Sequence, residues 1–128
     1  MLKNIINIFF LGIGGIGMSA LARWMKIKGF NVQGWDDQLD TTIINTLIDE
    51  DIFVYNKSIE DRFNLTYNTF KSENTILIYT PAIANSHPVF KLFQSKNIKF
   101  YKRSELLQYI SLDYKVIAIS GTHGKTTI

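Results

Sequence analysis

The sequence predicts an α/β protein with a Rossmann-like, doubly wound and mostly parallel sheet, followed by the first strand and phosphate loop of a truncated ATPase domain. Three observations predict this architecture. Short apolar runs alternate with segments of helical periodicity along the chain. The first apolar run leads into a glycine-rich turn that opens a helix, and the last run leads into a second glycine-rich turn at 121–127.

Composition and charge exclude several classes of protein. The chain has 128 residues, of which 46% are hydrophobic and 20% charged, so it can bury the core of one ordinary domain. The net charge is +3 and the lysines are scattered, which argues against nucleic-acid binding. No cysteine is present, so disulfides and thiolate metal sites are excluded. The apolar run at 5–11 is too short to span a bilayer, and we expect a cytoplasmic protein without a membrane partner.

The first glycine-rich turn has the G-x-G-x-x-G spacing of dinucleotide-binding folds, with Gly12, Gly14 and Gly17. Gly12 permits a tight turn, Gly14 lets a phosphate approach the backbone, and Gly17 lets the helix pack close to its strand. The helix N-terminus offers N–H groups to an anion. We therefore predict a phosphate-bearing ligand here. A turn that binds nothing is the alternative, and the extra Gly15 keeps it open.

The next segments continue the alternation of strand and helix. We expect a helix over 18–28 that ends at Gly29, and a strand over 30–35. The inner face of this helix should consist of Met18, Leu21, Ala22 and Met25. Asp36 follows Gly17 by about twenty residues, where such folds place an acidic residue for a ribose hydroxyl. A solvated turn aspartate or a helix cap is the alternative for Asp36.

The remaining elements complete the predicted sheet. Thr41 or Thr42 should cap a helix to about Glu50, with Ile43, Ile44, Leu47 and Ile48 on its inner face. The expected strands are 52–55, 75–79 and 98–101, with a loop and short helix at 56–74, a helix at 89–96 and a helix at 104–110 capped by Ser104. The loop after 75–79 lies at the carboxyl end of a strand, where open α/β sheets bind ligands.

The second glycine-rich turn is a shortened relative of the P-loop. Residues 115–120 are apolar and predict a strand, which leads into Gly121-Thr-His-Gly-Lys-Thr-Thr127. The usual first glycine is replaced by Ile119. Lys125 would reach the β- and γ-phosphates of ATP, and the hydroxyl of Thr126 would hold Mg²⁺. The ATP loop predicted here comprises Gly121, Thr122, His123, Gly124, Lys125, Thr126 and Thr127. For His123, simple packing is at least as good an interpretation as a catalytic role.

Together, the segments 12–19 and 121–127 resemble the Mur ligases of peptidoglycan synthesis, and 80–83 and 102–105 resemble two further segments of that family. The resemblance covers nearly the whole chain. It implies that residues 1–110 form a UDP-sugar-binding domain and that 111–128 begin the central ATP-binding domain. We expect the chain to be a piece of a longer enzyme and to lack ligase activity by itself.

The resemblance also implies a reaction. ATP, with Mg²⁺, phosphorylates the carboxylate of UDP-N-acetylmuramate, and the amine of L-alanine attacks the acyl phosphate. Lys125 and Thr126 are the implied catalytic residues, and Thr126 is the implied metal ligand. The glycine loop would hold the pyrophosphate, with Asp36 near the ribose or the uracil. The implied contacts with the UDP-sugar are Gly12, Ile13, Gly14, Gly15, Ile16, Gly17, Met18, Asp36, Thr80, Ala82 and Arg103.

Two departures from the family pattern and several alternatives stay open. The segment 55–58 reads Tyr-Asn-Lys-Ser where many relatives have Gly-His-Ser, and Trp35 replaces the serine that often precedes Asp36. A related ligase that attaches a tripeptide shares the His-Gly-Lys loop, although the run 12–18 favours the L-alanine-adding member. An NAD(P)-binding oxidoreductase or regulatory domain would explain the first loop but not 121–127. A binding module without chemistry is the third class.

Overall fold

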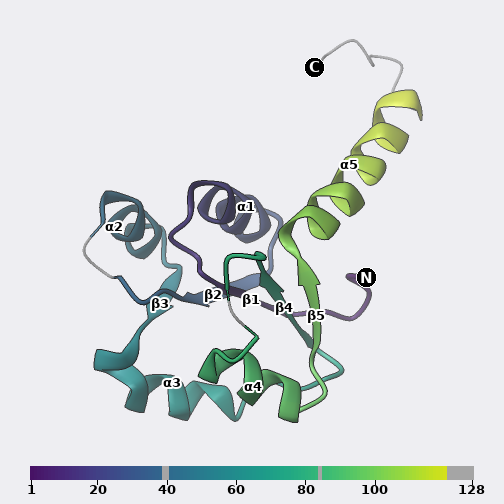
Figure 1. The fold of residues 1–128 in the computed structure, drawn as a ribbon. Coiled ribbons are helices and arrows are strands. Elements are labelled where there is room, and N and C mark those ends of the chain that lie inside the picture. Colours follow the sequence, from purple (N-terminus) through teal and green to yellow (C-terminus); the bar gives the residue numbers. More distant parts are fainter. Residues whose placement is uncertain (39–40, 84, 121–128) are drawn as a thin grey trace.

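The computed structural model describes residues 1–38, 41–83 and 85–120, with side chains described as far as Leu112. It contains a five-stranded, fully parallel sheet in the order β3-β2-β1-β4-β5 (Figure 1). The elements in chain order are β1 (Asn7–Leu11), α1 (Ile16–Ile27), β2 (Asn31–Trp35), α2 (Thr42–Asp49), β3 (Phe53–Tyr55), η1 (Lys57–Ile59), α3 (Glu60–Tyr67), β4 (Thr75–Tyr79), α4 (Pro88–Ser95), β5 (Lys99–Lys102) and α5 (Arg103–Ser120).

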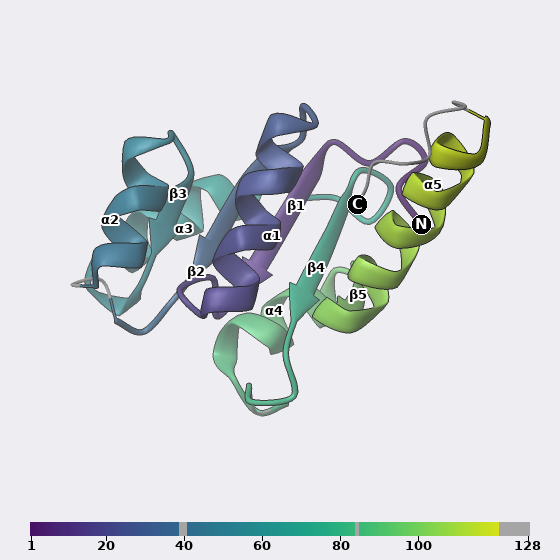
Figure 2. The same cartoon turned by 90° about the horizontal axis from the view of Figure 1, so that it is seen from above.

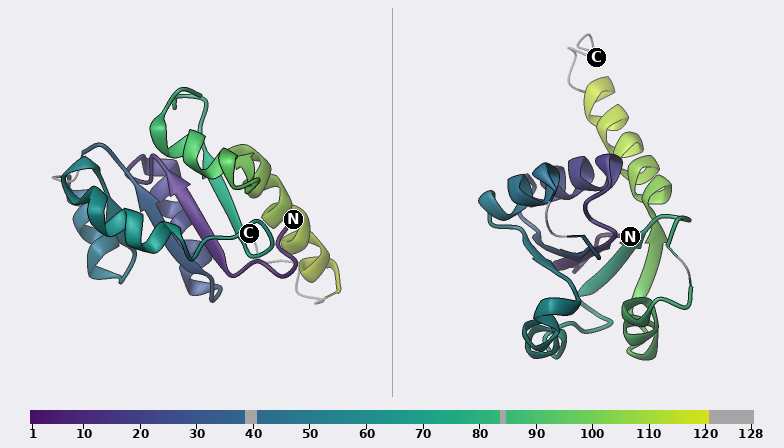
Figure 3. Two further views of the ribbon diagram at one scale, coloured as in Figure 1. Left: turned by 90° about the horizontal axis from the view of Figure 1, so that it is seen from below. Right: turned by 60° about the vertical axis from the view of Figure 1, so that its left-hand side comes forward.

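Helices cover both faces of the sheet, which confirms the doubly wound architecture. Helices α1, α2 and α5 lie on one face, and α3 and α4 lie on the other (Figures 1 and 3). From above, α2, α1 and α5 follow one another across the sheet (Figure 2). The chain therefore reverses its winding between β1 and β4, which are neighbours in the sheet although β2 and β3 come between them in sequence.

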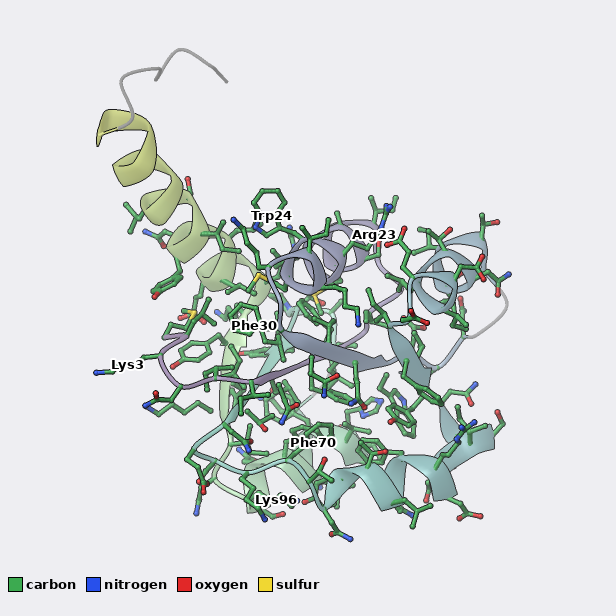
Figure 4. All side chains as sticks on the ribbon, turned by 180° about the vertical axis from the view of Figure 1, so that it is seen from behind. Lys3, Arg23, Trp24, Phe30, Phe70 and Lys96 are labelled. Carbon is green, nitrogen blue, oxygen red and sulfur yellow. The ribbon has the colours of Figure 1, made fainter. Side chains whose placement is uncertain are left out.

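Each face of the sheet has its own apolar core, because successive residues of a strand point to opposite faces. Ile8 and Phe10 of β1 pack with α1 and α2, whereas Phe9 and Leu11 pack under α3 and α4. The second core is mainly aromatic. The ring of Phe9 lies 4.7 Å from Phe93 and 5.7 Å from Phe63 and from Phe70, measured between ring centroids. Side chains fill the space between the sheet and both helical layers, with Phe70 on the α3/α4 side (Figure 4).

Helices α1 and α2 follow the predicted patterns with one exception. The four residues expected on the inner face of α1 are buried, and Gly29 adopts a φ of +102° just after the helix. Thr41 caps α2, since its Oγ1 accepts a hydrogen bond from Ile44 N–H at 3.1 Å. Ile48 is 48% exposed, so its predicted burial is wrong. Helix α2 lies over the edge of the sheet, against β3 and α1, and only a narrow stripe around Ile44 and Leu47 is covered.

The C-terminal part differs from the prediction. The strand expected over 115–120 is wrong, because α5 runs from Arg103 to Ser120. The domain boundary expected at 110/111 stays a prediction. An apolar run of this length has no periodicity that separates a buried strand from a helix. A strand needs a neighbour for its backbone hydrogen bonds, whereas a helix satisfies them within the segment. Helix α5 leads away from the sheet, where the described residues offer 115–120 no strand to pair with (Figure 1).

The start of α5 is also different. Ser104 lies inside the first turn and is not the cap. Instead, Glu105 Oε1 accepts the backbone N–H of Lys102 at 2.8 Å, which is the return half of a capping box.

Candidate functional site

The reversal of winding places a candidate binding site at the carboxyl ends of β1 and β4. In open α/β sheets, ligands bind in the crevice outside the strands at such a switch point. Here the glycine loop follows β1, the segment 80–83 follows β4, and the start of α5 follows β5 at the same edge of the sheet (Figure 2).

The glycine loop is held as a tight turn by the neighbouring strand. Gly12 has a φ of +86°, which favours glycine strongly, as predicted. The N–H groups of Gly12 and Ile13 both donate to the carbonyl of Trp35, at 2.7 and 3.2 Å. The Ile13 side chain is fully buried against Gly34, where a Cβ would lie 2.6 Å from its Cδ1. The backbone of this loop, and not the Ile13 side chain, faces the site.

The space beside Gly14 is taken by a carboxylate. Gly14 N–H donates to Asp36 Oδ2 at 2.8 Å, and a Cβ on Gly14 would lie 2.7 Å from that oxygen. Asp36 Oδ1 accepts the N–H of Gln38 at 3.0 Å. The missing Cβ of Gly14 thus makes room for the Asp36 carboxylate, and the predicted approach of a phosphate at Gly14 stays a prediction.

The N-terminus of α1 has no side-chain cap. Gly15 is the N-cap residue and offers no side chain, and the first turn carries no acidic residue. The N–H groups of Ile16, Gly17 and Met18 therefore have neither a helical partner nor a capping side chain. The Ile16 side chain is 80% exposed and that of Met18 is buried in the core, so Met18 can meet a ligand only through its backbone.

Arg103 reaches this helix end from the start of α5. A Cβ on Gly17 would lie 2.9 Å from one terminal nitrogen of Arg103 and 3.1 Å from its Cζ. The three heavy atoms nearest to a Cβ on Gly17 all belong to Arg103, so the missing side chain leaves room for the guanidinium, which the sequence did not predict. A guanidinium beside uncapped N–H groups is an arrangement that holds phosphate or carboxylate.

The segment after β4 packs onto the glycine loop. Ile83 N–H donates to Thr80 O at 3.0 Å, which folds the segment back, and Ile83 Cδ1 lies 3.2 Å from a Cβ placed on Gly12. Thr80 is half-buried and Ala82 exposed. The structure therefore brings this segment and the glycine loop to one rim, at the carboxyl ends of the strands, where the loop after 75–79 was predicted to lie.

Two adjoining hollows lie beside this rim and share Trp35, Asp37 and His87. One has a volume of about 240 Å³ and is lined also by Gly12, Asp36 and Ile83. The other, about 300 Å³, lies toward α3 and α4 and is lined by residues that include Lys57, Glu60, Asn64 and Leu92. Lys57 belongs to the segment that departs from the family pattern, and the structure places it at this hollow.

The residues shared by the two hollows are linked to one another. Asp37 Oδ1 accepts the Trp35 indole N–H at 2.9 Å, and Asp37 Oδ2 lies 3.6 Å from His87 Nε2. His87 Nδ1 accepts the N–H of Val89 at 3.1 Å and so caps α4. Neither His87 nor Asp37 is among the site residues predicted from the sequence. The signal for His87 was the His-Pro pair, since proline is favoured at the first position of a helix and the residue before it is then the cap.

The predicted ATP loop at 121–127 lies outside the described residues, and with it Lys125 and Thr126. Within the described ranges, no group of three or more His, Cys, Asp or Glu side chains is placed to hold a metal ion. Among the helices of those ranges, none combines the length and the apolar character that crossing a membrane requires.

Comparison with known proteins agrees with this geometry. A model of the Mur ligase family, catalytic domain, matches residues 7–115. The UDP-N-acetylmuramate–L-alanine ligase of Flavobacterium johnsoniae is 42% identical over 126 residues, and that of Christiangramia forsetii is 41% identical over 128. Each match covers 98% of this chain and 27% of the relative, so the chain spans about a quarter of the length of these proteins.

Two solved structures have the same fold. A UDP-N-acetylmuramate-alanine ligase from Thermotoga maritima superposes with a TM-score of 0.65 at 26% identity, over 85% of this chain and 23% of that one. A murein peptide ligase from Psychrobacter arcticus gives a TM-score of 0.66 at 15% identity, over 81% of this chain and 20% of that one. The second likeness concerns the fold alone.

Proposed function

Because this chain belongs to the Mur ligase family, we propose that it is the UDP-N-acetylmuramate-binding domain of a ligase that adds L-alanine to this sugar nucleotide in peptidoglycan synthesis. The observation that carries the proposal is the uncapped end of α1 with Arg103 seated against Gly17. The identity of about 40% to UDP-N-acetylmuramate–L-alanine ligases over 98% of the chain supports the choice of substrate.

The diphosphate of the sugar nucleotide is the group that fits this end of the sheet. Its charge is matched by the N–H groups of the first turn of α1 and by the Arg103 guanidinium, which can donate two parallel hydrogen bonds to phosphate oxygens. Thr80 and Ala82, on the same rim, would then contact the UDP-sugar. The adjoining hollows lined by Trp35 and His87 offer aromatic surface next to the phosphate position.

The chemical step of the proposed enzyme would use ATP and Mg²⁺. The proposal of ATP and Mg²⁺ rests on the sequence of the loop at 121–127, in which Lys125 would contact the β- and γ-phosphates and Thr126 would hold the metal. The muramoyl carboxylate would take the γ-phosphoryl group, and the amine of L-alanine would displace phosphate from the acyl phosphate. Since the chain spans about a quarter of its relatives, we propose that it releases no phosphate by itself. The expected cytoplasmic location and the absence of a nucleic-acid partner remain predictions.

A thermal-shift titration tests the proposal. UDP-N-acetylmuramate, NADH and ATP are titrated in parallel into the wild-type chain, because a ligand that binds only the folded state raises the melting temperature. We expect a rise with the UDP-sugar and none with NADH. Arg103→Ala should reduce the rise, whereas Arg23→Gln, a change of an exposed arginine that pairs with Glu50, should leave it unchanged. A rise with NADH alone would overturn the proposed ligand and favour a dinucleotide in the same site.

A further inference from the structure

Asp36, which follows β2, makes hydrogen bonds with three other residues at the carboxyl ends of the strands. Its Oδ2 accepts the N–H of Gly14 at 2.8 Å, and its Oδ1 accepts the N–H of Gln38 at 3.0 Å. Its own backbone N–H donates to the carbonyl of Tyr55, at the end of β3, at 3.0 Å. The side chain is therefore engaged on both oxygens, and its backbone is fixed by the neighbouring strand.

The glycine loop is shaped to receive this carboxylate. A Cβ on Gly14 would lie 2.7 Å from Asp36 Oδ2 and 2.8 Å from Ile44 Cδ1 of α2, so only glycine leaves the carboxylate its place. A Cβ on Gly15, the next residue, would have no heavy atom closer than 3.7 Å. The close fit is thus specific to position 14 and its carboxylate partner.

The carboxylate also determines where an anion can lie. A negative charge hydrogen-bonded to Gly14 N–H occupies that donor and repels a phosphate from that part of the loop. The N–H groups of Ile16, Gly17 and Met18 and the guanidinium of Arg103 lie at the other end of the loop and are favourable to an anion. The two ends of one glycine loop therefore differ in their electrostatic character.

We infer that Asp36 is a positioning residue: it holds the Gly14 end of the loop and so places the diphosphate at the Gly17–Arg103 end, without contacting the ribose of the ligand. This inference rests on the proposed function and departs from the ribose contact that the sequence spacing predicts. In this role the carboxylate accepts hydrogen bonds from the backbone N–H groups of Gly14 and Gln38, and none from the ligand.

Two measurements on Asp36→Ala and Asp36→Asn test this role. The first is hydrogen exchange of the Gly14 amide by NMR, in the chain without ligand. We expect exchange to accelerate about tenfold or more in Asp36→Ala, because the acceptor is lost, and less in Asp36→Asn, whose remaining oxygen can still accept. Asp49→Asn, an exposed change of the same kind on α2, should leave Gly14 exchange unchanged. Unchanged exchange in Asp36→Ala would overturn the inference.

The second measurement compares the affinities of UDP, 2′-deoxy-UDP and 3′-deoxy-UDP for the same proteins. Asp36→Ala should weaken all three by a similar factor of about ten, because losing the bond that holds the loop outweighs losing the repulsion between carboxylate and phosphate, and Asp36→Asn should recover part of the affinity. A ribose contact would instead make wild type prefer UDP, and Asp36→Ala would abolish that preference, which would overturn the inference. If wild type binds no UDP, the proposed function fails, and Gly14 exchange still decides the role of Asp36. If Asp36→Ala does not fold, Asp36→Asn provides both comparisons.

Discussion

The guanidinium of Arg103 lies where a side chain at position 17 would have to be. One terminal nitrogen is 2.9 Å from the Cβ that Gly17 lacks, although the two residues belong to α5 and α1. The start of α5 follows β5, which pairs with β4 next to β1, and this strand order brings the two helix ends together. Gly17 thus leaves space for a cation beside the uncapped N–H groups of α1.

This relationship predicts that Gly17→Ala weakens anion binding more than it weakens the fold. The Arg103 side chain is flexible and can move aside, so we expect the free energy of unfolding to change by less than about 1 kcal/mol. The affinity for UDP should fall about three- to tenfold, and Arg103→Ala should lower it about tenfold or more. Isothermal titration calorimetry with UDP measures the loss. Arg23→Gln, at an exposed arginine that pairs with Glu50, is the control, and an equal loss in that variant would contradict the role of Arg103.

A second prediction concerns the seat of the glycine loop on β2. A Cβ on Gly34 would lie 2.6 Å from both Ile13 Cδ1 and the backbone carbonyl of Phe10. A carbonyl within the central strand cannot move without disturbing its pairing, so Gly34→Ala should cost about 3 kcal/mol. Urea unfolding measures this loss against Gly15→Ala, which has room for its methyl group. A loss below about 1 kcal/mol would show that β1 and β2 can shift apart.

Much of the fold was predictable because local signals and the global architecture agree. The apolar strand before Gly12, the periodicity of α1 and the turn at Gly29 each indicate the observed element without help from tertiary contacts. The segment 115–120 has no such agreement. Its apolar residues fit a strand only if another strand lies beside it, and α5 leads away from the sheet. Strand preference depends on context more than helix preference does.

The site was predictable as a location and less so in its contacts. The spacing of glycines indicated the loop, and the charge of Arg103 indicated an anion partner. The partner of Asp36 was not predictable, since the same spacing in dinucleotide-binding folds indicates a ribose contact. The bond to Gly14 depends on the exact approach of the loops after β1 and β2. The link between Asp37 and His87 likewise joins residues that only the strand order brings together.

A third prediction concerns the exposed ion pair between α1 and α2. Arg23 donates to both carboxylate oxygens of Glu50, at 2.8 and 2.7 Å, and these hydrogen bonds lower the pKa of Glu50 below its ordinary value of 4.5. A lowered folded-state pKa contributes stability above the pKa of the unfolded chain, and this contribution disappears as the pH falls through the folded-state value. Wild type should therefore exceed Glu50→Gln in urea midpoint at neutral pH, and the difference should vanish at acidic pH. High salt should reduce the difference at neutral pH. If the difference in urea midpoint persists at acidic pH, it does not come from the charge of Glu50.

A fourth prediction concerns a buried hydroxyl between β3, β2 and α3. Tyr55 donates to Gln33 Oε1 at 2.7 Å and lies 3.0 Å from Thr66 Oγ1, and burial raises the pKa of its hydroxyl above 10.0, partly offset by the bond with Thr66. Tyr55→Phe keeps the ring in its aromatic cluster and removes only the hydroxyl, so we expect a loss of about 1 kcal/mol in the free energy of unfolding at neutral pH.

The same hydroxyl predicts a pH dependence of stability. A raised folded-state pKa contributes stability below the pKa of the unfolded chain, and this contribution is lost as the pH rises through the folded-state value. The stability of wild type should therefore decline above about pH 10 more steeply than that of the variant. Urea unfolding of both proteins from neutral pH to about pH 11 measures the two slopes. Parallel slopes would show that Tyr55 ionises as readily in the folded protein as in the unfolded chain, which would contradict a raised pKa of its hydroxyl.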